Sequence, residues 1–431
     1  MAHPWFLQRD NRLLQRKVNR VALQAEDTRL DPYEGIKDVL PGLPNDVTFC
    51  HITTKLPWQT IVFELSGVNW DWQKAIRSRL VYNARVASGS TEALVVVNYT
   101  VLKFEDRRPS VLAIGLYSIT EGSFHRLPPI PGEFKGIPRD CQCASLDGRI
   151  YVLGGFENRS GGELNSPSPK MYVMDLAGRG QWERCADMPF GRVCFGCGVM
   201  DGKIYVCGVR VDRWDNVLMK TREAEMYDPK QDKWSKLRSM EETRVYSDVT
   251  VMGSELVVHC GRFNNYDIIS PFWATLNNSN VCPMVYSPVN QEWRTIDLGP
   301  SLFDRNNNQV MFVARAEFHQ MNMHKLFVFD NDTTSWIQRH KISWAGIIRE
   351  IGNVKCASSW TTLAVDKELV MVLTWHKGRG RNKFGTELLY SKGFGGRNTF
   401  LQWKKADIFN ERNPGFLFRD HLRLMISVVK L

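Results

Sequence analysis

Short apolar runs recur along most of the chain at a long interval. Each unit carries an apolar run, a polar turn, a second run ending at or near glycine, and a third run followed by a turn and a tryptophan. The clearest copy consists of 143–155, 171–175 and Trp182. Its Asp147-Gly148 step lies between two apolar runs, as in a tight β-hairpin. We therefore predict four short strands, A to D, in each unit.

Five further copies of this pattern follow or precede the clearest one, and some are incomplete. They are 196–208 with 225–228 and Trp234; 248–261 with 284–286 and Trp293; 326–330 with Trp336; 388–390 with Trp403; and an opening half-copy, 111–118, with Phe124. An aromatic residue at the start of strand D is large enough to fill the wedge between neighbouring sheets. Six such anchors predict a mainly β chain folded as a six-bladed β-propeller, whose blades repeat radially. A β-sandwich with recurring turns is the alternative.

The first blade has no segment for its strand A. Its strands B, C and D are predicted on 94–99, on 111–118 and at Phe124, whereas the apolar end of the chain, 421–431, follows the last tryptophan. We expect this end to supply the missing strand and leave no open sheet edge.

The repeats resemble the kelch motif in their paired glycines, Gly154-Gly155, and in the spacing of Tyr172 and Trp182. Later copies keep one glycine of the pair, as at Gly208. This resemblance implies the propeller fold and, in most cases, a partner-binding role. Some kelch propellers are copper oxidases, so an enzyme is a formal alternative, although we find no set of Tyr and His ligands gathered near the axis.

Residues 39–85 have apolar positions at helical rather than alternating spacing. Asn45 or Asp46 is predicted to cap a first helix, which Leu56-Pro57 ends. The apolar residues of two further short helices are Ile61, Leu65 and Val68, and Trp72, Ile76 and Leu80. A helical cap packed on the propeller would show the same pattern.

The same segment resembles the F-box of plant F-box/kelch proteins. The resemblance lies in Leu-Pro-Gly-Leu-Pro-Asn-Asp-Val at 40–47, in Leu-Pro at 56–57, and in the spacing from Leu65 to Arg85, although Trp70 is atypical there. It implies the substrate receptor of an SCF-type cullin–RING ubiquitin ligase, which binds a Skp-family adaptor and, through it, the cullin and RING subunits. The residues implied to contact the adaptor are Leu40, Pro41, Leu43, Pro44, Val47, Leu56 and Pro57. A kelch scaffold without ubiquitin transfer is the alternative.

Trp72 is expected to brace the helices rather than join the adaptor surface. The predicted domains are an N-terminal extension, 1–38, that is partly disordered, the F-box, 39–85, and the propeller, 86–431.

Composition fits a globular protein with a sizeable core, since 43% of the 431 residues are hydrophobic and 24% are charged. The formal net charge of +10 is spread over the chain, so it does not favour nucleic-acid binding. We find neither a signal peptide nor 18 consecutive apolar residues, and expect a cytosolic or nuclear protein without a membrane segment.

The ten cysteines are expected to be reduced and buried. Cys194 and Cys197 form a CxxC that is predicted to lie on a strand, where the two thiols would face opposite ways and make a poor metal site. His319 and His324 are interpreted as polar groups of a hairpin loop. No hydrolase, P-loop or metalloprotease motif is found, so we expect a non-catalytic chain without cofactor or metal.

Strand parity predicts which end of the propeller binds the target protein. B–C and D–A loops share one end of antiparallel blades, and all long insertions are B–C loops. Arg, Trp and Tyr often dominate protein interfaces. The candidate target-binding residues at this end are Arg139, Arg192, Arg210, Trp214, Arg244, Arg262, Tyr266, Phe272, Trp273, Arg379 and Arg381. The alternative for Phe272 and Trp273 is that they pack their own loop against the blade. The alternative for the basic loop 377–383 is that it is solvated and binds no partner.

Overall fold

A computed structural model describes the chain in segments. They are residues 35–101, 111–131, 137–138, 141–156, 167–193, 195–208, 210–211, 218–219, 222–241, 247–260, 283–298, 309–314, 317–322, 325–342, 356–365, 368–376, 384–392, 400–406 and 426–431. The chain divides into two compact units. The first comprises Met1–Ala93, Met174–Gln181 and Lys430–Leu431, and the second comprises Leu94–Val173 and Trp182–Val429.

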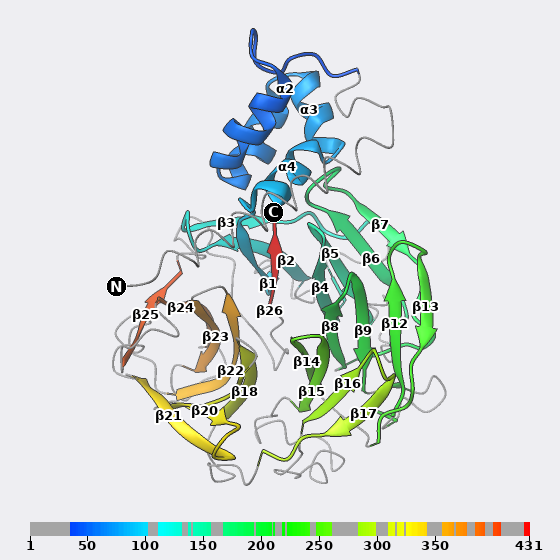
Figure 1. Cartoon of the computed structure of the whole chain (residues 1–431), viewed down its shortest axis with the longest axis vertical. Coiled ribbons are helices and arrows are strands. Elements are labelled where there is room, and N and C mark those ends of the chain that lie inside the picture. Colours follow the sequence, from blue (N-terminus) through cyan, green and yellow to red (C-terminus); the bar gives the residue numbers. More distant parts are fainter. Residues whose placement is uncertain are drawn as a thin grey trace. The chain divides into compact units, whose positions relative to one another are not determined.

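The described part of the first unit is mainly helical (Figure 1). Its helical elements are α2 (Asn45–Val47), η1 (Thr48–Ile52), η2 (Thr53–Lys55), η3 (Thr60–Glu64), η4 (Leu65–Gly67), α3 (Trp70–Arg77) and α4 (Leu80–Ser88). The first three follow one another without a break, and the run ends where Leu56 becomes extended before Pro57, as predicted. The third predicted helix is divided into α3 and α4, because Arg79 between them has a φ of 66°.

The prediction that Asn45 or Asp46 caps the first helix is wrong. The residue before α2 is Pro44, and no side chain caps the helix. The amide of Asn45 instead accepts a hydrogen bond from the backbone N–H of Val39 at 3.1 Å and donates to the carbonyl oxygens of Ile36 and Lys37. Because these bonds satisfy the buried Asn45 side chain, it secures the preceding loop rather than the helix terminus.

Trp72 braces the helices, as predicted. Its side chain is 2% exposed and meets the ring of Phe49 edge to face, with 5.9 Å between the ring centroids. The two rings come from α3 and η1, so this contact joins the first and the third predicted helix. Packing of aromatic side chains therefore holds the small helical core together.

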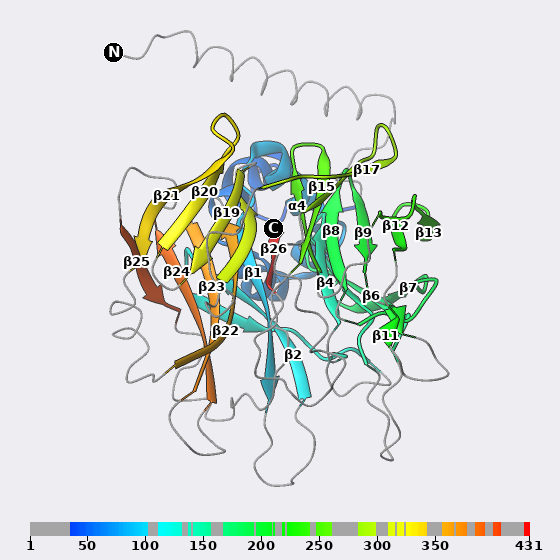
Figure 2. The same ribbon diagram turned by 90° about the horizontal axis from the view of Figure 1, so that it is seen from below.

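The second unit is a six-bladed β-propeller, which confirms the predicted fold (Figures 1 and 2). The first three blades are β26 (Ile426–Lys430), β1 (Ala93–Val101), β2 (Val111–Ser118) and β3 (Ser123–Arg126); β4 (Gln142–Leu146), β5 (Arg149–Leu153), β6 (Met171–Asp175) and β7 (Trp182–Cys185); and β8 (Gly196–Met200), β9 (Lys203–Cys207), β12 (Ala224–Asp228) and β13 (Lys233–Lys236). A small hairpin of β10 (Arg210–Val211) and β11 (Leu218–Met219) separates β9 from β12.

The last three blades follow the same order. They are β14 (Ser247–Met252), β15 (Glu255–Cys260), β16 (Met284–Ser287) and β17 (Glu292–Thr295); β18 (Gln309–Ala314), β19 (Glu317–Asn322), β20 (Lys325–Asp330) and β21 (Ser335–Ile342); and β22 (Cys356–Val365), β23 (Glu368–His376), β24 (Phe384–Lys392) and β25 (Phe400–Lys405). The first strands of successive blades, from β4 to β22, lie next to one another. The last two blades form one eight-stranded sheet, because β21 and β25 pair in parallel.

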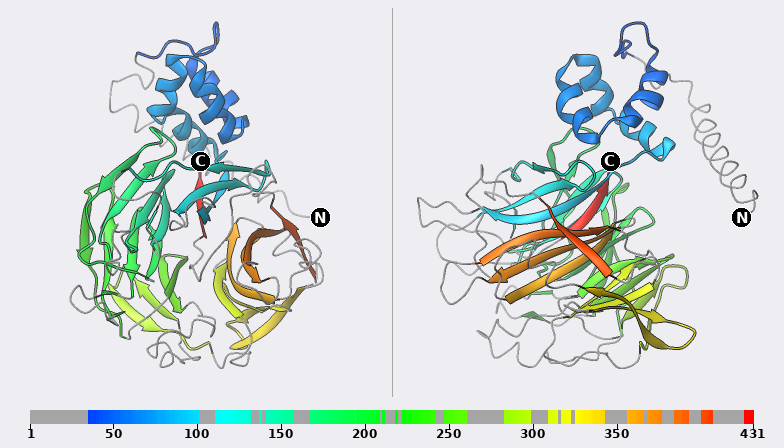
Figure 3. Two further views of the ribbon diagram at one scale, coloured as in Figure 1. Left: turned by 180° about the vertical axis from the view of Figure 1, so that it is seen from behind. Right: turned by 90° about the vertical axis from the view of Figure 1, so that its left-hand side faces the viewer.

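Strand β26 lies beside β1 at the edge of the first sheet (Figure 3). It thus supplies the fourth strand of a blade whose other three strands come from the beginning of the propeller sequence. The strand covers Ile426–Lys430, and 421–425 lies outside the described residues.

In four of the six blades, the tryptophan at or near the start of strand D links the blade to the preceding one. Its indole N–H donates to a backbone carbonyl just after the preceding blade's last strand, from Trp182 to Pro128 at 2.8 Å, from Trp234 to Ala186 at 3.0 Å, from Trp293 to Arg238 at 2.7 Å and from Trp336 to Leu298 at 3.1 Å. In three of these blades the indole also packs on the aromatic residue directly opposite on strand C, with 5.0 to 5.3 Å between ring centroids. The repeated aromatic anchors therefore stabilise the junctions between blades.

The Asp-Gly turns have the predicted conformation. Asp147 and Gly148 have φ values of 50° and 67°, and Asp201 and Gly202 have values of 50° and 73°. Positive φ at both central residues is the geometry of a type I′ hairpin turn.

Replacing Gly154 by alanine is expected to destabilise the propeller by about 2–4 kcal/mol. Gly154 has a φ of 62°, and a Cβ there would lie 2.6 Å from the carbonyl oxygen of Arg192. Gly202→Ala is the matched control, since its φ is also positive but no atom lies within 4 Å of the added Cβ. It is expected to lose only about 1–2 kcal/mol. Equal losses in urea unfolding would show that the close approach does not require the glycine.

Candidate partner-binding surfaces

A tight turn presents the Leu-Pro motif of the first unit. The backbone N–H of Leu43 donates to the carbonyl oxygen of Leu40 at 3.1 Å, and Gly42 within the turn has a φ of 76°. The N–H of Thr48 then donates to the carbonyl oxygen of Pro44 at 3.0 Å, so the turn leads directly into α2. This local geometry fixes the motif at the start of the helical segment.

All seven residues predicted to contact an adaptor are accessible. Pro41 and Pro44 are exposed, whereas Leu40, Leu43, Val47, Leu56 and Pro57 are half-buried. Their neighbours Val39 and Phe49 are buried in the helical core. The exposed part of each half-buried leucine is available to a partner. Their role in adaptor binding stays a prediction.

Arg85 holds the second Leu-Pro step in place. Its Nη1 donates to the carbonyl oxygens of Thr53 at 3.0 Å and Leu56 at 2.6 Å, at the end of η2. The guanidinium also lies over the ring of Trp58, 5.9 Å from its centroid. Burial lowers the pKa of Arg85 from its ordinary value, and the Glu92 carboxylate acts in the opposite direction. The buried cation thus adds a donor to the Thr53 carbonyl, which also accepts the N–H of Leu56, and supplies a donor to the Leu56 carbonyl just beyond η2.

Replacing Arg85 by alanine is expected to destabilise the helical unit by about 2–4 kcal/mol. In a buried place, the change removes the guanidinium donor from the Leu56 carbonyl and from the Thr53 carbonyl, which keeps the N–H of Leu56. Helix loss followed by circular dichroism, with unfolding of the propeller followed separately, checks this expectation. Exposed Arg77→Ala is the control, and an equal loss in both variants would contradict the assigned role.

Arg192 differs from its sequence expectation. Its side chain has no exposed surface, and its guanidinium donates to the Glu225 carboxylate at 2.6 Å and to the Gly208 carbonyl oxygen at 2.8 Å. The backbone of Arg192 does meet the β5–β6 connection, through Gly155 and Ser168, as strand parity requires for a D–A loop. Because the side chain turns inward to a buried carboxylate, however, Arg192 is not a surface contact for a target.

Glu225 is the residue that sequence reasoning overlooked. It lies on β12, is 1% exposed, and has its pKa raised by burial, while the charge and hydrogen bond of Arg192 act in the opposite direction. A carboxylate between apolar residues of a strand rarely stays buried without a partner. That pattern, Ala-Glu-Met-Tyr at 224–227, is the sequence feature from which a buried cation could have been expected.

The structure describes the backbone of one other candidate target-binding residue. Arg210 lies on β10, but its side chain is not described. The remaining candidates lie outside the described residues, namely Arg139, Trp214, Arg244, Arg262, Tyr266, Phe272, Trp273, Arg379 and Arg381. Their assignment to the B–C and D–A end stays a prediction.

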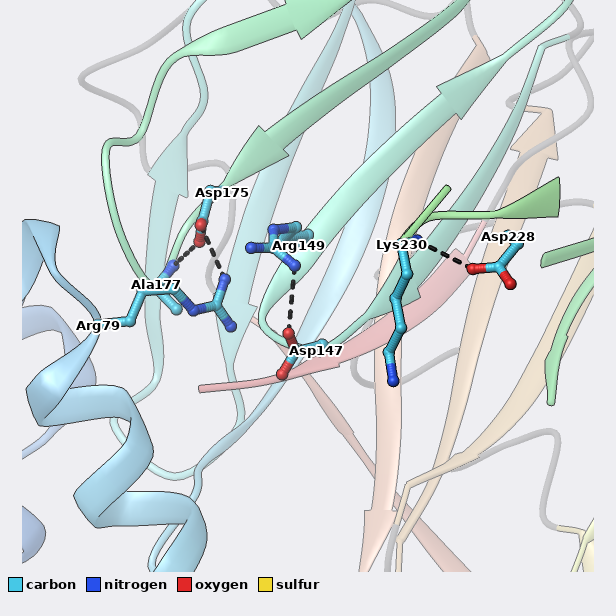
Figure 4. A network of polar contacts seen from close by, with 7 residues as sticks. All are labelled: Arg79, Asp147, Arg149, Asp175, Ala177, Asp228 and Lys230. Atoms are coloured by element: carbon cyan, nitrogen blue, oxygen red, sulfur yellow. Dashed lines mark hydrogen bonds and ion pairs between the residues drawn. The ribbon is translucent and has the colours of Figure 1, made fainter. Parts of the chain in front are cut away.

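The acidic residues at the ends of several C strands have structural roles (Figure 4). One carboxylate oxygen of Asp175 accepts the backbone N–H of Ala177 at 3.1 Å, and Asp228 accepts that of Lys230 at 2.9 Å. These bonds form turns that lead toward strand D. Asp175 also pairs with Arg79 at 2.7 Å, within the first unit.

The described part of the chain contains no group of three His, Cys, Asp or Glu side chains arranged to hold a metal ion. Its helices include none that is both long and apolar enough to cross a membrane. His319 lies within β19 and is 3% exposed, so its interpretation as a loop group is wrong, while His324 lies outside the described residues. His319 is buried because the expected hairpin turn begins three residues later, after Asn322.

Cysteine burial is mixed. Cys141 and Cys207 are buried as expected, three others are half-buried, and Cys50 is exposed on η1, contrary to the expectation of burial. Cys197 lies on β8, whereas its CxxC partner Cys194 lies outside the described residues.

Comparisons with known proteins agree with this architecture. Residues 138–189 match the kelch motif. An F-box/kelch-repeat protein of Arabidopsis thaliana is 26% identical over 287 residues, which are 57% of this chain. The F-box protein AFR of the same plant is 26% identical over 250 residues, 56% of this chain, and a further F-box/kelch-repeat protein is 24% identical over 292 residues, 65% of this chain.

The matched regions span 67%, 60% and 70% of those three proteins, respectively. The kelch match covers the second blade, where the paired glycines, the tyrosine and the tryptophan all occur. In its kelch motif, its six-bladed propeller and these relatives, the chain is similar to plant F-box/kelch-repeat proteins.

Proposed function

We propose that the chain is the substrate-recognition subunit of an SCF-type cullin–RING ubiquitin ligase, acting in the cytosol or nucleus. Its helical unit would bind a Skp-family adaptor, which links it to the cullin and RING subunits. Its propeller would hold a target protein for ubiquitination and proteasomal degradation. The observation that carries the proposal is the accessible Leu-Pro surface on a helical unit that precedes a kelch propeller in the same chain.

Such a receptor makes and breaks no bonds itself. By holding the target close to a ubiquitin-charged enzyme, it replaces a rare encounter in solution by a high effective concentration. The required properties are two independent binding surfaces and a stable scaffold. The accessible leucines support the first surface, and the indole hydrogen bonds between blades support the scaffold.

Binding of the purified full chain to Skp-family adaptors tests the proposal. We expect a stable complex that assembles with cullin and RING subunits and ubiquitinates captured targets. Affinity capture from cells with the leucines of the Leu-Pro surface replaced should trap undegraded target. Failure of the intact chain to bind any Skp-family adaptor would instead favour a kelch scaffold that acts without ubiquitin transfer.

We further propose that the B–C and D–A end of the propeller binds the target, with the basic loop 377–383 attracting an acidic segment. Charge reversal at Arg379 and Arg381 is expected to weaken target capture about tenfold at low salt. The difference should shrink at about 0.5 M salt, because screening then acts within a few ångströms. Capture that is independent of salt and of these changes would show that the loop is merely solvated. Reversal at Arg149, the first residue of β5 after an A–B turn, is the control.

A further inference from the structure

Two of the large apolar side chains that the described residues expose are two positions apart in the sequence of the first unit. The exposed set is Val68, Trp70, Val86, Val251, Val289 and Ile337. Trp70 is 80% exposed and Val68 is 62% exposed, and only Asn69 separates them in the chain. Contiguous exposed apolar patches mark interaction sites more often than ordinary protein surface, and a tryptophan exposed to this extent is a candidate centre for one.

The position of Trp70 is fixed by its own helix. Asn69 is the N-cap of α3, and its side-chain oxygen accepts the backbone N–H of Trp72 at 2.9 Å. Trp72 is in turn buried against Phe49. Trp70 therefore lies in the first turn of a capped helix that is anchored on the core. A side chain held in this way can insert into a partner with little loss of backbone entropy.

Hydrogen bonds connect α3 to the segment that precedes the Leu-Pro surface in the chain. The carboxylate of Asp71 accepts the backbone N–H of Lys37 at 3.2 Å, and the ammonium of Lys74 donates to the carbonyl oxygen of Gly35 at 2.7 Å. Lys74 is four residues after Trp70, so the two lie on the same side of α3. Residues 35–39 run along α3 and continue directly into the turn at Leu40. The helix that carries the exposed indole is therefore tied to the segment that leads into the surface assigned to the adaptor.

We propose that Trp70, together with Val68, is an additional anchor for the Skp-family adaptor and extends the Leu-Pro surface along α3. This inference rests on the proposed function. The partner site it requires is an apolar pocket with a carbonyl or carboxylate oxygen at its rim, since the indole supplies one apolar body and one N–H donor. The indole N–H has no partner within the described part of the chain. Trp is also the residue type most enriched among interface hot spots.

Adaptor affinity measured with the full chain tests the proposal. Trp70→Ala is expected to weaken binding at least tenfold, mainly through faster dissociation, while Trp70→Phe retains part of the affinity. Val289→Ala is the matched control, because Val289 is 85% exposed but lies in the propeller unit. Thermal unfolding of the Trp70 variants should match that of the unmodified chain, since a side chain this exposed adds little to folding.

Three outcomes would overturn the proposal. Binding within threefold of the unmodified chain, while Leu43→Ala with Leu56→Ala abolishes it, would leave the proposed function intact and remove Trp70 from the interface. A change only in self-association, measured by light scattering, would assign the patch to a second copy of the chain. If deletion of residues 1–34 abolishes the effect of Trp70→Ala, the occupant is the chain's own N-terminal segment. Absence of any adaptor binding by the unmodified chain would reject the proposed function together with this inference.

Discussion

Replacing Leu43 and Leu56 together by alanine is expected to abolish adaptor binding while the propeller stays folded. Both leucines are half-buried in the first unit and belong to the accessible Leu-Pro surface. An apolar anchor of this kind contributes about 2 kcal/mol or more to an interface. Loss of two anchors should therefore weaken binding about a thousandfold. Isothermal calorimetry or surface plasmon resonance with purified adaptor measures the change directly.

Two controls separate lost contact from lost folding. Val289→Ala, in the turn between β16 and β17, should leave adaptor affinity unchanged. Circular dichroism should show unchanged helix content in the double variant, because the buried residues Phe49, Ile61 and Trp72 remain in place. Adaptor binding that survives the double change within threefold would show that these leucines are not the contacts.

Breaking the ion pair between Arg192 and Glu225 is expected to have the largest effect on stability. Both side chains are at most 2% exposed, and their charged atoms lie 2.6 Å apart. Removing one partner leaves the other charge buried and unpaired, which costs about 3–5 kcal/mol. Arg192→Ala and Glu225→Gln should therefore each lower the midpoint of denaturant unfolding strongly. Charge reversal at Arg192 would bring two carboxylates together and should prevent folding.

An exposed pair in the same propeller is the matched control. Arg238 and Glu292 are 3.0 Å apart, but their side chains are 65% and 62% exposed. Arg238→Ala is expected to lose no more than about 1 kcal/mol. Replacing Arg192 and Glu225 together by methionine should restore much of the lost stability, because no buried charge remains. Similar losses in Arg192→Ala and Arg238→Ala would contradict the role of the buried pair.

This pair changes how a target-binding experiment must be designed. Charge reversal at Arg192 would unfold the propeller. Target capture would then be lost even though Arg192 makes no contact with the target. Charge reversal at Arg379 and Arg381, in the basic loop, examines the same end of the blades without touching the buried pair. Any loss of capture in those variants should be accompanied by an unchanged unfolding midpoint.

Local sequence determined the repeating elements. Each Asp-Gly step needs only its own two residues to adopt positive φ, so the turns at 147–148 and 201–202 follow from the sequence. The strand pattern and the aromatic anchors likewise depend on spacings within one unit, and together they predicted six blades. Counting strands also showed that the first blade needs one more, and β26 lies beside β1.

Helix boundaries were less well determined by sequence. The spacing of Trp72, Ile76 and Leu80 fits one continuous helix, yet the chain breaks between α3 and α4 at Arg79. The guanidinium of Arg79 pairs with Asp175, which lies 96 residues away in the sequence, and stacks over Tyr82. A pattern of apolar positions contains no information on such a distant partner.

The sequence by itself therefore determined the order and type of the blades, the Leu-Pro motif and its accessible position, since these depend on neighbouring residues. Only the tertiary structure decided which polar residues face inward. Arg192 is a polar loop residue in the sequence, but the propeller brings it against Glu225, 33 residues away, and buries both. An arginine pairs with a carboxylate in the same way whether that carboxylate belongs to a binding partner or is buried in the arginine's own domain. Only the position of the carboxylate in the structure distinguishes the two cases. Trp70 is the opposite case, an apolar residue that faces outward. Phe49 and Trp72 pack in the helical core, whereas the indole of Trp70 lies at the surface.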